Sequence, residues 1–405
     1  MLIIVIEILM YILLSKRLLK KRLFNYKLLI FTLFIQLLIL ICYRIELTTL
    51  GREVYYSDAY NYWEQTKLLL ADINNYSLID KITGGQTFYV LFCYLIQKTS
   101  LFQSPILLNL SNLLLLNNTI FIFAYLLDKI NIRASTIKFY LFFLLNNPLI
   151  IYSLIRNMKD ALILFLTVLL VLFFIRFIEN KNKIYIVYIG IILYISVKIR
   201  PWSFLNILIL LIIYFNYKRE TIKKDRALKM ILLFLILIVF ATLFLSKYFS
   251  SINLWLPIML ENTLKNGYIS NFLSPFKILL GPGPLRSILG SKYFLYTTTI
   301  GNICSFLGSL IWWFFMAYMI VILIYKKKNK KNLIGQCFLG IFIIYIILYS
   351  MQYGGSLELR FRAVIYVIST TTFFSYYDYI FIRKHLVDYA VILSFVFIIG
   401  LIASI

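Results

Sequence analysis

Apolar stretches, most of them close to the length that crosses a lipid bilayer, recur along almost the whole chain. A spanning helix needs about 20 apolar residues, with roughly 17–25 as the range. Nine stretches fit or come close: 28–43, 105–127, 138–155, 161–178, 230–246, 303–325, 333–350, 363–382 and 389–404. Three shorter ones could span if their polar flanks reach the interface: 1–15, 184–199 and 202–216. Because 62% of the residues are hydrophobic and only 14% are charged, the chain is predicted to be an all-α, polytopic membrane helix bundle of about twelve transmembrane helices, forming one domain over residues 1–405.

The net charge of +25 comes from short basic clusters between the apolar stretches. Six of these lie in alternate loops: 16–27, 128–138, 176–183, 218–229, 326–331 and 383–384. Together they carry 25 of the 41 lysines and arginines, as expected of cytoplasmic loops that face anionic membrane lipid. This pattern puts both termini outside, and it argues against nucleic acid as a partner.

Two long segments, 44–104 and 247–302, are predicted to lie outside the membrane, where long structured loops usually carry function. Within the first, residues 86–98 are apolar but only 13 residues long, so we expect them to lie at the interface without crossing. The four cysteines are scattered, without the paired spacing of a disulfide framework or a metal site. We therefore expect no metal and no cofactor.

Carboxylates and aromatic residues are concentrated at the start of the first external loop. Asp58 is the main candidate for a general base, with Glu53 as a possible second acid. Tyr60 and Trp63 are candidates for stacking against sugar rings. The alternative interpretation is an interfacial aromatic belt with solvated charges.

Cations also occur at external helix ends, where the topological preference for cytoplasmic lysine and arginine is broken. They are Arg156, Lys159, Arg200, Arg286, Arg360 and Arg362. Two cations in the short turn before Asp160 suit a phosphate held at the membrane surface, although Asp160 could be a second acid or simply cap a helix. A snorkelling pair of Lys198 and Arg200 is the alternative at the next turn. Together these groups favour an anionic, membrane-anchored substrate, such as a lipid-linked phosphate or diphosphate.

Six short motifs, in this order, resemble elements of membrane glycosyltransferases of the GT-C type and of bacterial O-antigen or capsule polysaccharide polymerases. They are Ser57–Tyr60, Gly84–Tyr89, Lys159–Asp160, Arg200–Pro201, Gly281–Pro284 and Gly354–Arg362. The GT-C enzymes often carry paired acids or Asp-x-Asp, and Asp58 has no such adjacent partner. The resemblance is therefore nearer to the polymerases.

The resemblance implies transfer of a glycan from undecaprenyl diphosphate to a sugar hydroxyl, on the external face of the bacterial cytoplasmic (inner) membrane. Donor and acceptor would both be polyprenyl-diphosphate-linked glycans, and a chain-length regulator protein would be a possible further partner. The competing interpretation is a flippase for lipid-linked oligosaccharides. Flippases usually have short loops and line a central cavity with cations, whereas these cations lie at helix ends beside long loops.

Overall fold

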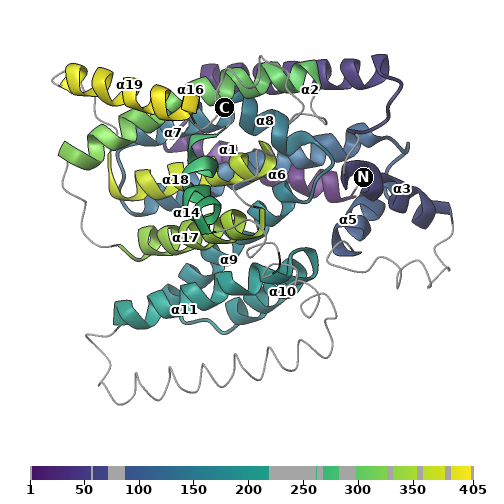
Figure 1. Ribbon diagram of the computed structural model, residues 1–405. Coiled ribbons are helices and arrows are strands. Elements are labelled where there is room, and N and C mark those ends of the chain that lie inside the picture. The colour runs from purple at the N-terminus through teal and green to yellow at the C-terminus, as the bar shows by residue number, and fades with distance from the viewer. Residues whose placement is uncertain are drawn as a thin grey trace.

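The computed structural model describes residues 2–55, 58–71, 87–218, 261, 268–281, 298–325, 332–353, 359–378 and 385–402. Within these ranges the chain forms fifteen α-helices and one short 3-10 helix, and no strand. This agrees with the predicted all-α class (Figure 1).

The first ten elements run from the N-terminus to the middle of the chain: α1 (Leu2–Lys20), α2 (Tyr26–Thr49), α3 (Asp58–Ala71), α5 (Thr87–Lys98), α6 (Pro105–Lys129), α7 (Ala134–Leu145), α8 (Pro148–Ile155), α9 (Asp160–Asn180), α10 (Ile184–Ile199) and η1 (Pro201–Ser203). The remaining helices are α11 (Phe204–Lys218), α14 (Tyr268–Leu280), α16 (Thr299–Tyr325), α17 (Leu333–Tyr353), α18 (Leu359–Tyr376) and α19 (Leu386–Ile402).

Five of the described helices are long and apolar enough to cross a membrane: α2, α6, α9, α16 and α17. Taken together, α7 and α8 would make a sixth, bent span. The described residues therefore support a membrane protein with fewer certain spans than the predicted total of about twelve. Helices α10, α11 and α19 are apolar but shorter, and the predicted span 230–246 lies outside the described residues.

The predicted span 138–155 is not one straight helix, because α7 and α8 meet at a bend of 55°. The Asn147 side chain accepts hydrogen bonds from the backbone N–H groups of Leu149 and Ile150, at 3.0 and 3.2 Å. Pro148 occupies the first position of α8, where a missing N–H costs nothing. These residues start a new helix, so the local sequence breaks the span.

Helix α18 lies at the centre of the bundle, and all of its residues are buried. It packs against α7, α8, α14 and α17, among others. Its polar side chains are satisfied in part along the helix itself, since the Thr371 and Thr372 hydroxyls each donate to a carbonyl one turn earlier. The stretch predicted as the span 363–382 is therefore mostly enclosed by protein.

Three of the six basic segments gather at one end of the bundle within the described residues. Lys21 forms an ion pair with Asp128, and Lys129 with Glu179. These two contacts bring together three of the segments predicted to be cytoplasmic, 16–27, 128–138 and 176–183. Asp378, just after α18, lies 3.5 Å from Arg133, so this end also includes the end of α18.

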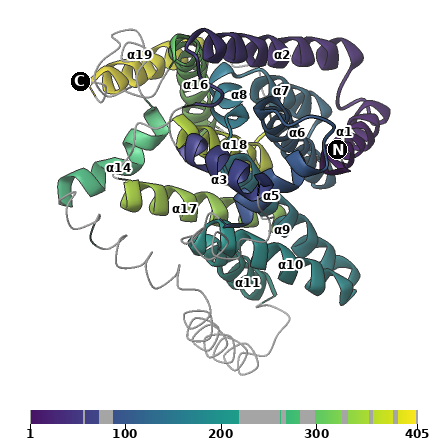
Figure 2. The same cartoon turned by 90° about the vertical axis from the view of Figure 1, so that its right-hand side faces the viewer.

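The opposite end carries α3 and α5, which pack against each other near the N-terminus (Figure 1). Figure 2 views this end, with α3 and α5 in front of α18. Helix α5 has 12 residues and rises only about 18 Å, short of a hydrocarbon core of about 30 Å. That length fits the interfacial placement predicted for residues 86–98, which remains a prediction.

Candidate active site

Five charged residues from four segments meet at the end of the bundle that carries α3. We call Asp58, Lys159, Asp160, Arg200 and Arg360 the charged cluster. Arg200 Nη2 donates to Asp160 Oδ1 at 2.5 Å. Arg360 Nη1 donates to Asp58 Oδ2 at 2.9 Å, and Arg360 Nε lies 3.8 Å from Asp160 Oδ2. Arg360 thus stands between the two carboxylates and joins α18 to both α3 and α9.

Helix ends explain why these residues meet. Asp58 and Asp160 are the first residues of α3 and α9, where a carboxylate is favoured by the helix dipole. Arg200 follows the last residue of α10, which Pro201 prevents from continuing. Arg360 is the second residue of α18. The cluster is therefore built from the termini of four long segments.

The two carboxylates differ sharply in exposure. The Asp160 side chain is 0% exposed and its partner Arg200 5% exposed, whereas the Asp58 side chain is 44% exposed. A buried and paired carboxylate mainly fixes the geometry around it. Asp58 is the carboxylate that a substrate could reach.

Lys159 completes the cluster from the turn between α8 and α9. Its Nζ lies 5.9 Å from the centre of the Tyr62 ring, within range of a cation–π contact. Burial, followed by repulsion from Arg200, lowers the pKa of Lys159 to about 7. Since arginine stays charged in proteins, Lys159 is the one cation of this cluster that can change its charge near neutral pH.

The rings around Arg200 come from residues that the sequence analysis did not assign to the site. Its guanidinium lies 5.5 Å from the centre of the Phe361 ring and 5.8 Å from the rings of Trp202 and Tyr349. These three rings surround the guanidinium that pairs with Asp160. Nothing in the spacing of Tyr349 along the sequence would have indicated this.

The turn that carries Lys159 is held by amides of neighbouring helices. On α6, Asn109 and Asn112 donate to the backbone carbonyls of Ile155 and Arg156, at 2.9 and 2.6 Å. Asn157 accepts from the Tyr89 hydroxyl at 2.9 Å. The sequence signal was present, because two asparagines three residues apart lie on one face of a helix. Their partners could only be seen in the structure.

Arg156 lies in an aromatic setting next to this turn. Its guanidinium is 4.7 Å from the centre of the Tyr55 ring and 5.5 Å from that of Tyr152, and the residue is buried. Its predicted role in phosphate binding therefore remains a prediction, and among the described contacts it is set apart from the carboxylates of the charged cluster.

The other candidates in the first loop, Glu53, Tyr60 and Trp63, differ in their burial and contacts. The indole N–H of Trp63 donates to Glu53 at 2.6 Å, and this hydrogen bond lowers the pKa of Glu53. Trp63 is buried whereas Tyr60 is exposed. Of the two aromatic residues predicted to hold sugar, Tyr60 is the one with an accessible ring.

Arg362 faces away from the charged cluster, although the sequence groups it with Arg360. Two residues along an α-helix are about 200° apart around its axis. The side chain of Arg362 reaches Gly281, where the Cβ of any larger residue would lie 3.3 Å from Nη1. Gly281 follows α14 with φ at +82°, a conformation that favours glycine. Arg286, the remaining cation candidate, lies outside the described residues.

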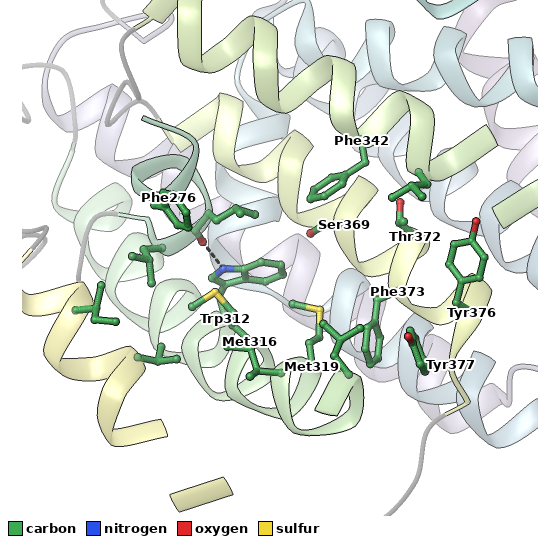
Figure 3. Close-up of a pocket in the computed structure, with 17 residues that line it drawn as sticks. Phe276, Trp312, Met316, Met319, Phe342, Ser369, Thr372, Phe373, Tyr376 and Tyr377 are labelled. Atoms are coloured by element: carbon green, nitrogen blue, oxygen red, sulfur yellow. Dashed lines mark hydrogen bonds between the residues drawn. The ribbon is translucent and has the colours of Figure 1, made fainter. Parts of the chain in front are cut away.

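An apolar groove lies beside α18, at the end of α14 that precedes Gly281 (Figure 3). It has a volume of about 520 Å³ and is lined by residues of α14, α16, α17, α18 and α19. Trp312 forms one wall and stacks on Tyr366 with ring centres 3.8 Å apart. Met316, Met319 and Phe373 line the groove further along. Its size falls within the roughly 300–1,000 Å³ of ordinary ligand sites.

Comparisons with protein-family models, with curated proteins and with solved structures find no match to this chain. Among the described residues, no three histidine, cysteine, aspartate or glutamate side chains are grouped so that they could hold a metal ion. The function is therefore inferred from the geometry of the charged cluster.

Proposed function

We propose that this protein is a membrane glycosyltransferase that polymerises undecaprenyl-diphosphate-linked oligosaccharide units on the external face of the bacterial cytoplasmic membrane. The observation that carries the proposal is the charged cluster. It combines an accessible carboxylate with three cations at the end of the bundle opposite the three described basic segments. The cations can stabilise an anionic leaving group, and the carboxylate can accept the proton that an attacking hydroxyl loses.

The chemistry follows from these groups. A hydroxyl oxygen of the acceptor sugar forms a bond to the anomeric carbon of the donor glycan and gives its proton to Asp58. The bond between that carbon and the diphosphate oxygen breaks, and the electron pair leaves with the diphosphate. Arg360, Arg200 and Lys159 stabilise the charge that develops there. Asp58 then returns its proton to solvent.

The apolar groove supports a substrate with a long hydrocarbon chain. Because such a chain comes from the bilayer and not from water, close van der Waals packing in the groove, and not the hydrophobic effect, would stabilise the complex. The groove adjoins Tyr366 and lies on the Arg362 side of α18, so chain and head group could contact different faces of this helix. In this proposal α1, α10, α11, α18 and α19 and the sequence-predicted span 230–246 also lie in the membrane, which with the six spans above makes about twelve.

Deletion of the gene, followed by a gel of surface polysaccharide, tests the proposed function. Loss of a polymerase should leave single repeat units on the cell surface, restored to a ladder by the wild-type gene supplied in trans. Loss of a flippase for the same substrate should leave no units at all. An unchanged ladder would contradict both functions.

A further inference from the structure

Arg360 holds two carboxylates, of which only one is accessible. We propose that the Asp58 carboxylate occupies the subsite on Arg360 that takes a phosphate oxygen of the substrate, so that substrate binding displaces Asp58 and frees it to accept the proton. This inference rests on the proposed function and assigns the phosphate subsite to one atom, Arg360 Nη1.

Arg360 is positioned to exchange one partner without moving. Its Nε faces the buried Asp160 at 3.8 Å, and Asp160 is itself fixed by Arg200. Its Nη1 faces Asp58 at 2.9 Å, with the Met158 sulfur 3.4 Å away on the other side. Loss of the Asp58 contact therefore leaves the guanidinium anchored through Asp160. A guanidinium presents several donors in one plane, which suits the paired oxygens of a phosphate.

Asp58 is the partner that can leave. Its side chain is partly exposed, and it is the first residue of α3, so a change of rotamer needs no repacking of the bundle. Water solvates the Asp58 carboxylate at this exposure, which weakens its pairing with the buried Arg360 relative to a fully buried ion pair. A diphosphate carries more charge than one carboxylate and competes strongly for the same donor.

The charge balance of the cluster supports this exchange. With all five groups ionised, three cations face two carboxylates, which leaves a surplus of one positive charge. When Asp58 turns away, three cations face Asp160 alone, and the surplus becomes two. A diphosphate bonded to a lipid on one side and a sugar on the other carries two negative charges. The displacement therefore matches the charge of the site to that of the proposed substrate.

The exchange has an unusual consequence, because removing Asp58 should improve binding while it slows transfer. Calorimetric titration of the purified full-length protein in detergent with geranylgeranyl diphosphate measures the binding step without an acceptor sugar. Asp58→Asn should bind this probe about fivefold more tightly than the wild type, the size of effect expected from an ion pair with one exposed partner. Asp58→Ala should do the same, and both should leave binding of uncharged geranylgeraniol unchanged.

Glu64→Gln is the matched control. Glu64 lies on the same helix and pairs with Lys67 at 2.6 Å, so its replacement removes an equal charge from α3 without touching Arg360. Its affinity for the diphosphate should stay within about twofold of the wild type. Equal tightening in the Asp58 and Glu64 variants would reduce the effect to general electrostatics and overturn the proposal.

The failure of this inference is distinguishable from failure of the proposed function. Unchanged or weaker diphosphate binding in both Asp58 variants would refute the displacement even if gene deletion left single repeat units. Tighter binding in both, together with an unchanged polysaccharide ladder after deletion, would support the phosphate subsite and refute the polymerase. Arg360→Lys should weaken binding of the probe by about tenfold, since it removes the planar donor; wild-type affinity there would also contradict the subsite.

Discussion

The two ends of the bundle use the same kinds of ion pair in opposite environments. At the basic end, Lys21–Asp128 and Lys129–Glu179 join residues that remain partly exposed to solvent. At the other end, Arg200 and Asp160 are both buried. An exposed ion pair costs little free energy of desolvation and adds little to stability, whereas burying a charge costs much free energy unless the charge is well paired. Membrane topology is a sufficient reason for the charges at the basic end. The buried Arg200–Asp160 pair needs a different reason, which is that it positions the accessible charged groups beside it.

The largest effect is expected from Asp58→Asn, which tests whether this end performs chemistry. Loss of a general base typically lowers a rate by about 10²–10⁴-fold. The variant should accumulate normally in membranes, because the replaced side chain is partly exposed. Polymer length and amount on a gel, compared with Glu64→Gln at equal protein levels, measure the effect. Wild-type polymer from Asp58→Asn would remove Asp58 from the mechanism.

The next effect concerns folding and comes from Asp160→Asn. This substitution removes the carboxylate that neutralises the buried Arg200 and leaves Arg360 with Asp58 alone, and breaking a buried pair in this way costs about 3–5 kcal/mol. The free energy of unfolding in mixed micelles, titrated with a denaturing detergent, provides the measurement. A variant as stable as the wild type would show that the pair is well solvated and that the two ends do not differ as described.

A smaller effect is expected from pH through Lys159. Its pKa of about 7 is set by burial and by Arg200 and Arg360, opposed by Asp160 and Asp58. An anion at the cluster favours the charged form of Lys159, so binding above pH 7 must take up a proton. The affinity for geranylgeranyl diphosphate should therefore fall as pH rises from 7 to 9, by at most about tenfold per unit.

Lys159→Met should abolish most of this dependence, and at pH 9 its affinity should approach that of the wild type. Titrations at several pH values, with the Tyr60→Phe variant as a control for the neighbouring surface, would measure it. If affinity changed equally with pH in the wild type and in Lys159→Met, the titrating group would be on the ligand and not Lys159.

The smallest effect belongs to the basic end. Glu179→Gln removes the partner of Lys129 from a partly exposed pair, and such pairs contribute about 0–1 kcal/mol. Its free energy of unfolding, measured under the same conditions as that of Asp160→Asn, should be close to that of the wild type. If it fell as far as that of Asp160→Asn, the contrast between the two ends would be wrong.

Several parts of the site were accessible from sequence because they depend on local rules. Asp160 stands at a helix start and Arg200 immediately before a proline, and both positions follow from chain-breaking and dipole preferences. Arg360 and Arg362 belong to one sequence motif, but their side chains face opposite sides of α18. The helical repeat predicts that the Arg360 and Arg362 side chains diverge, but it does not predict which residues each of them contacts.

By itself, the sequence determined that the described chain is helical and apolar, and it predicted the common end at which three of its basic segments meet, because hydropathy and charge act on each segment independently. Only the tertiary structure decided that α18 is enclosed by protein and that Asp58 and Arg360, 302 positions apart, are in contact. Such pairings depend on how helices pack around one another, and helices that are apolar on most faces carry little information on which neighbour each face will meet.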